Sequence, residues 1–199
     1  MNKQGSDRKM VNSNYLVGFV VAILGIVVNI PFASSQTNNN KLEQSIKLAH
    51  NQIWAKFIHE PTGLFYDYQV PDENGIPTPD ECKSMKPNAL SWWVPNENGG
   101  FFNGIYLAAL SNKWNIEQNN TTASEARKIS SGLMLLAFVA EKPGFIARGV
   151  STDGVSHFPI SSADQVWPWF YGMWSYAQSG IPNEIERNAV ITVMKSVAI

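Results

Sequence analysis

The chain has 199 residues, of which 44% are hydrophobic, 12% aromatic and 16% charged. This composition is typical of a globular protein with a well-buried core, and it argues against intrinsic disorder. The formal net charge is -1, whereas proteins that bind nucleic acid need clustered lysine and arginine for phosphate contacts. We therefore expect no nucleic-acid partner.

The first 35 residues have the pattern of a targeting segment. Three basic residues precede an apolar run over residues 16–28, and small residues suited to cleavage follow at 33–35. This pattern predicts a signal peptide over 1–35, a polar spacer over 36–40 and a secreted or periplasmic mature protein. An uncleaved N-terminal membrane anchor is the alternative, although the apolar run is shorter than the roughly 20 residues of a spanning helix.

Hydrophobic periodicity predicts that the rest of the chain is helical. The five expected helices cover, in order, residues 42–59, 99–114, 122–140, 164–180 and 183–199. The first, third and fifth are amphipathic, whereas the second is apolar nearly all round and should be buried on most sides. The third should begin at a capping box formed by Thr122 and Glu125. In the fourth, Trp167, Tyr171 and Trp174 recur at helical spacing, which favours a core position.

The helices form two copies of one unit. Under a shift of 81 residues, Ile53, Phe57, Glu60, Gly63 and Leu64 match Met134, Phe138, Glu141, Gly144 and Phe145. Under a shift of 68 residues, Phe102, Gly104, Tyr106 and Ala109 match Phe170, Gly172, Trp174 and Ala177. The unit is therefore an amphipathic outer helix, a long polar loop, a buried inner helix and a short return. The glycines of the inner helices should let them approach closely.

Four motifs give the chain a resemblance to a known superfamily. They are GLFYDY and GFIARG after the outer helices, NGGFFNGIYLAAL as an inner helix and SSADQ at the start of the next. With them, residues 41–199 resemble the six-hairpin glycosidases. The resemblance implies an all-α fold of antiparallel helical hairpins, an incomplete (α/α)6 toroid of about two and a half hairpins. We expect the chain to be part of a longer protein, and a small independent bundle is the alternative.

The resemblance implies a carbohydrate substrate, bound where the long loops between outer and inner helices gather. Glycoside hydrolysis needs two carboxyl groups, one as acid and one as base or nucleophile. Asp164 is the expected base, because a helix N-terminus favours an ionised carboxylate. Glu97 is its expected neighbour, and Asp153 or His157 could supply the acid. Alternatively, Asp164 is only the N-cap of a helix that has Pro168 in its first turn.

Further loop-end side chains are expected to bind the carbohydrate. These are Trp92, Trp93, Arg148, Gln165, Trp169 and Tyr171. A structural ion pair with Asp153 or Glu141 is the alternative role for Arg148. The three histidines are scattered and lack metal-site spacing, so we expect no metal and no cofactor.

Three functions fit these residues. The first is a glycoside hydrolase-like enzyme acting on a polysaccharide fragment. The second is a polysaccharide lyase acting on uronic-acid sugars, with His157 or Tyr171 as the neutral base and Arg148 holding the carboxylate. The third is a non-catalytic helical protein that binds a glycan or another protein. The sequence favours the first and leaves the other two open.

Overall fold

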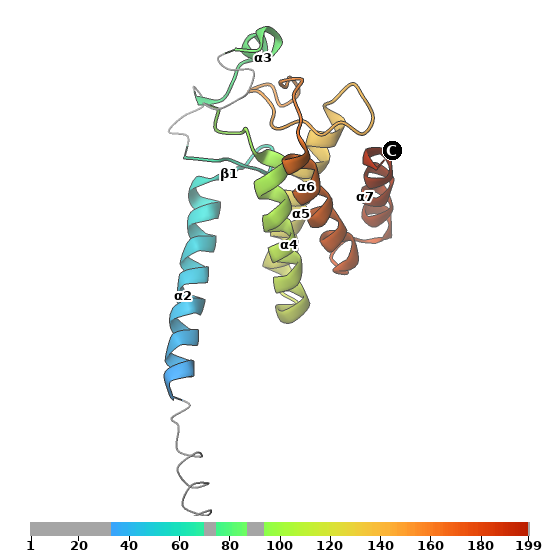
Figure 1. Ribbon diagram of the computed structural model, residues 1–199. Coiled ribbons are helices and arrows are strands. Elements are labelled where there is room, and N and C mark those ends of the chain that lie inside the picture. The colour runs from blue at the N-terminus through green and yellow to red at the C-terminus, as the bar shows by residue number, and fades with distance from the viewer. Residues whose placement is uncertain (1–32, 70–74, 87–93, 199) are drawn as a thin grey trace, which may run out of the picture. The chain divides into compact units, whose positions relative to one another are not determined.

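The computed structural model describes residues 33–69, 75–86 and 94–198 (Figure 1). The chain divides into two units, Met1–Ala49 and His50–Ile199, and the second contains the long loops. Among the described residues, no helix combines the length and the apolar character needed to cross a bilayer. Most of the predicted targeting segment lies outside the described residues.

The described residues form an all-α fold with one short ribbon, which confirms the all-α part of the predicted fold class. The elements are α2 (Ala33–Lys56), β1 (Ile58–His59), β2 (Leu64–Phe65), α3 (Pro79–Ser84), α4 (Gly99–Glu117), α5 (Asn120–Phe138), α6 (Ala163–Gln178) and α7 (Glu184–Val197). All five predicted helices are present. The first of them begins earlier than expected, so the predicted spacer over 36–40 is helical. The antiparallel ribbon and α3 were not predicted.

Local side-chain chemistry explains where the helices begin. At α7, Asn183 and Glu186 form a capping box in which each side chain accepts a hydrogen bond from the other residue's backbone nitrogen. At α5 the predicted capping box is wrong. Asn119 caps this helix by accepting a hydrogen bond from the backbone nitrogen of Thr121 at 2.8 Å, and Glu125 instead contacts His50.

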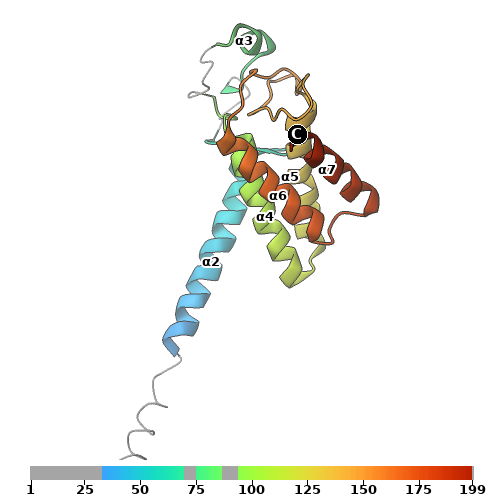
Figure 2. The same ribbon diagram turned by 45° about the vertical axis from the view of Figure 1, so that its right-hand side comes forward.

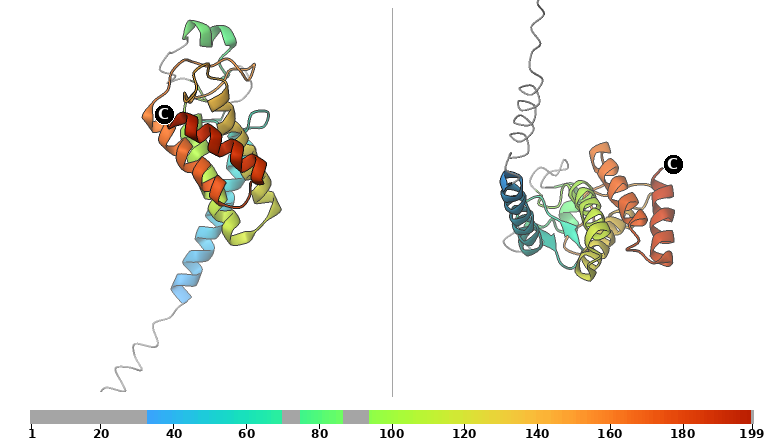
Figure 3. Two further views of the ribbon diagram at one scale, coloured as in Figure 1. Left: turned by 90° about the vertical axis from the view of Figure 1, so that its right-hand side faces the viewer. Right: turned by 90° about the horizontal axis from the view of Figure 1, so that it is seen from below.

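Four helices make up most of the second unit (Figures 1 and 2). The inner helices α4 and α6 pack against each other and run in the same direction, away from the end where the long loops gather. The helix α5 returns in the opposite direction and packs on both, and α7 packs on α5 and α6 (Figure 3). Because both inner helices start at the same end, the loops that precede them meet there.

Two glycines allow α4 and α6 to approach at backbone distance. A methyl group on Gly104 would overlap the carbonyl group of Pro168, and one on Gly172 would lie 2.7 Å from the Cα of Gly104. Either methyl group would be closer to the facing backbone than the radii of the atoms allow. The prediction that these glycines permit close helix packing is confirmed.

The glycines that follow the outer helices also occupy equivalent places. Gly63 and Gly144 both adopt the left-handed conformation, with φ of 70° and 84°, which a residue with a side chain adopts at a cost. Gly63 lies against the backbone carbonyl of Lys128 in α5, and Gly144 lies against that of Ser196 in α7. Each glycine therefore abuts the next outer helix, which supports the predicted repeat.

The face that α6 turns to the core differs from the expected one. Its buried residues are Gln165, Trp169, Gly172, Met173, Tyr176 and Ala177. Successive residues are about 100° apart around a helix, so Trp167, Tyr171 and Trp174 fall on the opposite side from this set. Their exposed fractions are 76%, 56% and 55%. The prediction that these rings are core residues is wrong, because the contact of Gly172 with α4 fixes the rotation of α6.

The expectation that Trp169 forms a sugar platform is wrong for the same reason. Trp169 is fully buried in the core, and its indole nitrogen donates a hydrogen bond to the carbonyl oxygen of Leu133 at 2.8 Å. A buried indole with a satisfied N–H is part of the packing between α5 and α6.

A chain of hydrogen bonds joins the end of α2 to α4 and α5. Trp54 Nε1 lies 2.9 Å from the hydroxyl of Tyr106, which lies 2.8 Å from Nδ1 of His50, whose Nε2 lies 3.1 Å from Glu125. An indole can only donate and a carboxylate can only accept. With a neutral His50 ring that carries its hydrogen on Nε2, all bonds in the chain run from Trp54 towards Glu125.

We expect Gly104→Ala to destabilise the protein. Alanine normally stabilises a helix interior by up to ~1 kcal/mol relative to glycine, but here overlap with the carbonyl of Pro168 should dominate and lower the free energy of unfolding by about 1–3 kcal/mol. Urea denaturation measures the change. The exposed Asn115 of α4 supplies the control, Asn115→Ala, which should be neutral or stabilising. Equal stability of the two variants would contradict the close packing.

Tyr106→Phe should destabilise the protein by about 1–3 kcal/mol, because the indole N–H of Trp54 and Nδ1 of His50 lose their shared partner in a partly buried place. Thermal and urea unfolding test this. The same chemical change on an exposed ring, Tyr171→Phe, is the matched control and should have no measurable effect.

Candidate functional site

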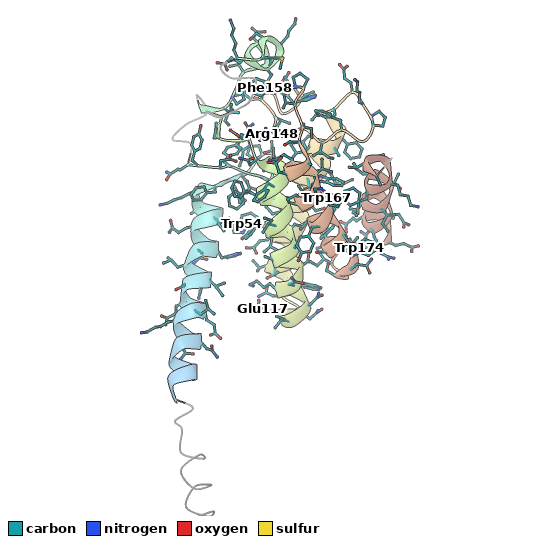
Figure 4. The ribbon with its side chains drawn as sticks, in the orientation of Figure 1. Trp54, Glu117, Arg148, Phe158, Trp167 and Trp174 are labelled. Atoms are coloured by element: carbon teal, nitrogen blue, oxygen red, sulfur yellow. The ribbon has the colours of Figure 1, made fainter. Side chains whose placement is uncertain are left out.

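A cluster of polar residues lies where α4 and α6 begin. We call it the loop-end cluster, and it consists of Asp67, Glu97, Asn98, Arg148, Asp164 and Gln165. Its members come from both long loops and from the starts of both inner helices. Arg148 is labelled in Figure 4, at the end where the loops gather.

Asn98 connects most of the cluster. Its side-chain oxygen accepts hydrogen bonds from Gln165 Nε2 at 2.7 Å and from Arg148 Nη2 at 3.3 Å. Its backbone and side-chain nitrogens donate to the two carboxylate oxygens of Asp67 at 3.1 Å and 2.5 Å. One asparagine therefore ties the first loop to the second and to the start of α6.

The side chain of Gln165 has a structural role. It is fully buried, and its oxygen accepts a hydrogen bond from the backbone nitrogen of Phe101 at 3.1 Å. This N–H belongs to the first turn of α4, where backbone donors lack partners within the helix. Both ends of the Gln165 amide are thus engaged within the protein, and the expected substrate contact is not available to it.

Arg148 forms its ion pair with Glu97. Nη2 of Arg148 lies 3.5 Å from the Glu97 carboxylate, and Nε donates to the Glu97 backbone oxygen at 3.0 Å. The side chains are only 14% and 17% exposed. A structural ion pair was one expectation for Arg148, but its partner is neither Asp153 nor Glu141.

Two carboxyl groups of the cluster bind protons more tightly than usual. Burial raises the pKa of Glu97, with smaller contributions from the negative charges of Asp67 and Asp164, while Arg148 opposes the rise. Burial also raises the pKa of Asp67, against the hydrogen bonds from Asn98 and the charge of Arg148. A helix N-terminus such as that of α4 lowers the pKa of a nearby carboxyl group, but at Glu97 burial outweighs this effect. A raised pKa is the property that a proton donor needs.

Asp164 lies in the first turn of α6 and is exposed. The N-cap of this helix is Ser162, so the prediction that Asp164 is the N-cap is wrong. Pro168 consequently lies inside the helix and not in its first turn. An exposed carboxylate close enough to influence the pKa of Glu97 fits the expected role as a base.

Asp153 organises the loop in which it lies. Its carboxylate accepts hydrogen bonds from the hydroxyls of Ser151 and Ser156 at 2.6 Å and 2.7 Å, and from the backbone nitrogens of Val155 and Ser156 at 2.9 Å and 2.8 Å. The hydroxyl hydrogen bonds, from Ser151 first, hold the pKa of this carboxyl far below its usual range. These contacts make Asp153 a structural residue of its loop, and the stabilised carboxylate disfavours its predicted role as the acid.

His157 lines a different hollow. Its ring lies 6.2 Å from that of Phe145, in a groove of about 370 Å³ that Lys83 and Lys142 also line. None of the loop-end cluster residues lines this groove. Of the four aromatic side chains predicted to contact the carbohydrate, Trp92 and Trp93 lie outside the described residues.

Two members of the cluster, Asp67 and Asn98, were not among the expected site residues. A signal existed for both, because Asp67 stands in GLFYDY and Asn98 opens NGGFFNGIYLAAL. Within residues 33–69, 75–86 and 94–198, no group of three or more histidine, cysteine, aspartate or glutamate side chains could hold a metal ion.

Comparisons of the chain with protein-family models, with curated proteins and with solved structures found no match. A function for this protein therefore has to be inferred from the geometry of the loop-end cluster and of the helices that carry it.

The pKa of Glu97 should respond in opposite directions to two substitutions. Arg148→Gln should raise it, because the guanidinium that stabilises the ionised form is lost. Asp164→Asn should lower it, because a repelling charge is removed. Carbon-13 NMR titration of the carboxyl groups measures both changes. The exposed Glu184 of α7 supplies the control Glu184→Gln, which should leave the Glu97 pKa unchanged. A lower Glu97 pKa in Arg148→Gln would contradict the assigned electrostatics.

Proposed function

We propose that the protein is an exported, carbohydrate-active protein resembling a glycoside hydrolase, with Glu97 as the acid and Asp164 as the base. The observation that carries this proposal is the contrast between two neighbouring carboxyl groups. Glu97 is partly buried and has a raised pKa, whereas Asp164 is exposed to solvent. Different environments that separate the protonation of two carboxyl groups are typical of an acid and base pair.

The arrangement of the helices is compatible with the proposed toroid. In that architecture α4 and α6 would be inner helices, and α5 and α7 outer helices. The inner helices begin side by side at the loop end, as the proposed cleft requires. Inverting enzymes hold their two carboxyl groups ~6.5–9.5 Å apart, and here Glu97 stands just before α4 and Asp164 in the first turn of α6, two helices that are in contact.

The proposed reaction uses the two carboxyl groups on opposite sides of the sugar. Glu97 donates its proton to the leaving oxygen as the glycosidic carbon–oxygen bond breaks. Asp164 accepts a proton from the water molecule whose oxygen forms the new bond to the anomeric carbon. Arg148 is a positioning residue, since it holds Glu97 by both its backbone oxygen and its carboxylate.

The lyase alternative has less support. It needs Arg148 to hold a substrate carboxylate, but this guanidinium already contacts Glu97 and Asn98. A partly buried arginine engaged with protein partners would have to give them up to bind a uronate.

Activity assays on a panel of neutral and uronic-acid polysaccharides test the proposal. We expect new reducing ends to form, and Glu97→Gln or Asp164→Asn to lower kcat by about 10²–10⁴. The exposed Asp80 of α3 supplies the control Asp80→Asn, which should keep full activity. Unsaturated products that absorb ultraviolet light would identify a lyase, and binding without turnover would identify a non-catalytic glycan-binding protein. Either result would overturn the hydrolase assignment.

A further inference from the structure

A second hollow, which we call the three-helix groove, lies between α5, α6 and α7, helices that pack against one another (Figure 3). Its volume is about 390 Å³, within the range of small-molecule sites in proteins. Five apolar side chains form most of its wall: Met134, Leu135, Phe138, Ala189 and Val190. None of the residues that line it belongs to the loop-end cluster, so the groove is a separate place on the molecule.

Tyr176 of α6 brings an unpartnered hydroxyl group to the three-helix groove. The residue is 2% exposed and lines the groove. Within the described parts of the chain its hydroxyl forms no hydrogen bond, yet it is not sealed from solvent. Since almost all of the side chain is buried, the hydroxyl reaches solvent through the groove. Buried phenol groups normally have a hydrogen-bond partner, and here only a molecule in the groove can supply one.

The hydroxyl groups that face the groove are neutral. Burial raises the pKa of Tyr176 to about 12, with a smaller contribution from the charge of Glu186, while Arg127 opposes the rise. The phenol therefore keeps its proton at neutral pH and can both donate and accept. A second hydroxyl, that of Ser130, is also buried and donates to the sulfur of Met173 at 3.9 Å. Sulfur is a weak acceptor, so this hydroxyl can turn to a ligand at little cost.

The two charged side chains that line the groove are already engaged with the protein. Nε of Arg127 lies 3.5 Å from the carboxylate of Glu186, and Nη2 donates to the backbone oxygen of Ile181 at 2.6 Å. Glu186 also accepts a hydrogen bond from the backbone nitrogen of Asn183 at 2.8 Å. An anionic ligand would meet the charge of Glu186 and a cationic one that of Arg127. The groove therefore favours a ligand without net charge.

We propose that the three-helix groove binds a small neutral molecule with an apolar body and one hydroxyl or carbonyl oxygen, which forms a hydrogen bond with Tyr176. The apolar body contacts the side chains of α5 and α7, and the oxygen lies at the bottom of the groove, where α6 passes. Such a ligand bridges three helices and completes the hydrogen bonding of a buried phenol.

Four probes of one size test the class of ligand: 2-naphthol, naphthalene, 2-naphthoate and 2-naphthylmethylamine. They are titrated into the full chain, labelled with carbon-13 at the methionine methyl groups. Met134 lines the groove, and the exposed Met85 beside α3 is the internal reference. We expect 2-naphthol to shift the signal of Met134 but not that of Met85. It should bind about two- to tenfold more tightly than naphthalene, and more tightly than either charged probe.

Three variants test the residues. Tyr176→Phe should weaken binding of 2-naphthol to the level of naphthalene, and it should leave the stability of the free protein unchanged, because the hydroxyl has no partner to lose. Ala189→Phe should fill the groove and weaken binding of 2-naphthol more than tenfold. Asn188→Phe is the matched control, because it adds the same ring at an exposed position of α7 that does not line the groove.

Several results would overturn the inference. They are the absence of a Met134 shift, equal binding of 2-naphthol by the wild-type protein and Tyr176→Phe, and tighter binding of 2-naphthoate than of 2-naphthol. A dimer in analytical ultracentrifugation that Ala189→Phe abolishes would also overturn it, since a second copy of the chain would then occupy the groove. None of these measurements depends on the proposed carbohydrate-active function.

Discussion

The backbone contact between Gly104 and Gly172 is the constraint on which the second unit depends. Without side chains at these positions, α4 and α6 approach until main-chain atoms touch. This contact fixes both the distance between the helices and the rotation of α6. The distance brings together the two loops that form the cluster, and the rotation decides that Trp169 enters the core while Trp167 faces solvent. Two small residues thus determine the positions of several large ones.

The loop-end cluster places one arginine among three carboxyl groups. Arg148 faces Glu97 directly and influences Asp67, and both carboxyl groups are partly removed from water. Burying carboxylates is costly unless they are neutralised or hydrogen-bonded. The cluster uses both solutions, because Asn98 donates two hydrogen bonds to Asp67 while Arg148 forms an ion pair with Glu97.

The helices and the repeat could be predicted because they depend on local patterns. Periodic apolar residues identified all five long helices, and the paired glycines identified the close contact between α4 and α6. The faces of α6 could not be predicted, since Trp167 and Trp169 are both aromatic and only the tertiary position of Gly172 distinguishes them. The partner of Arg148 was predicted wrongly. The expected partners are close to it in sequence, whereas Glu97 is 51 positions away and is brought to Arg148 only by the tertiary fold. The hydrogen bond from the backbone nitrogen of Phe101 to the side chain of Gln165 joins two different helices. The residues around Phe101 therefore do not predict it.

The glycines that follow the outer helices have a consequence for how the sequence can vary. Gly63 and Gly144 each touch a backbone carbonyl of the next outer helix, so the spacing between successive outer layers is set by main-chain atoms. Main-chain atoms are the same whatever side chain is attached to them. The exposed residues of α5 and α7 can therefore be exchanged for others without altering that spacing, as long as the two glycines are kept. In this respect the exposed side of these helices is tolerant of mutation, whereas the glycines are not.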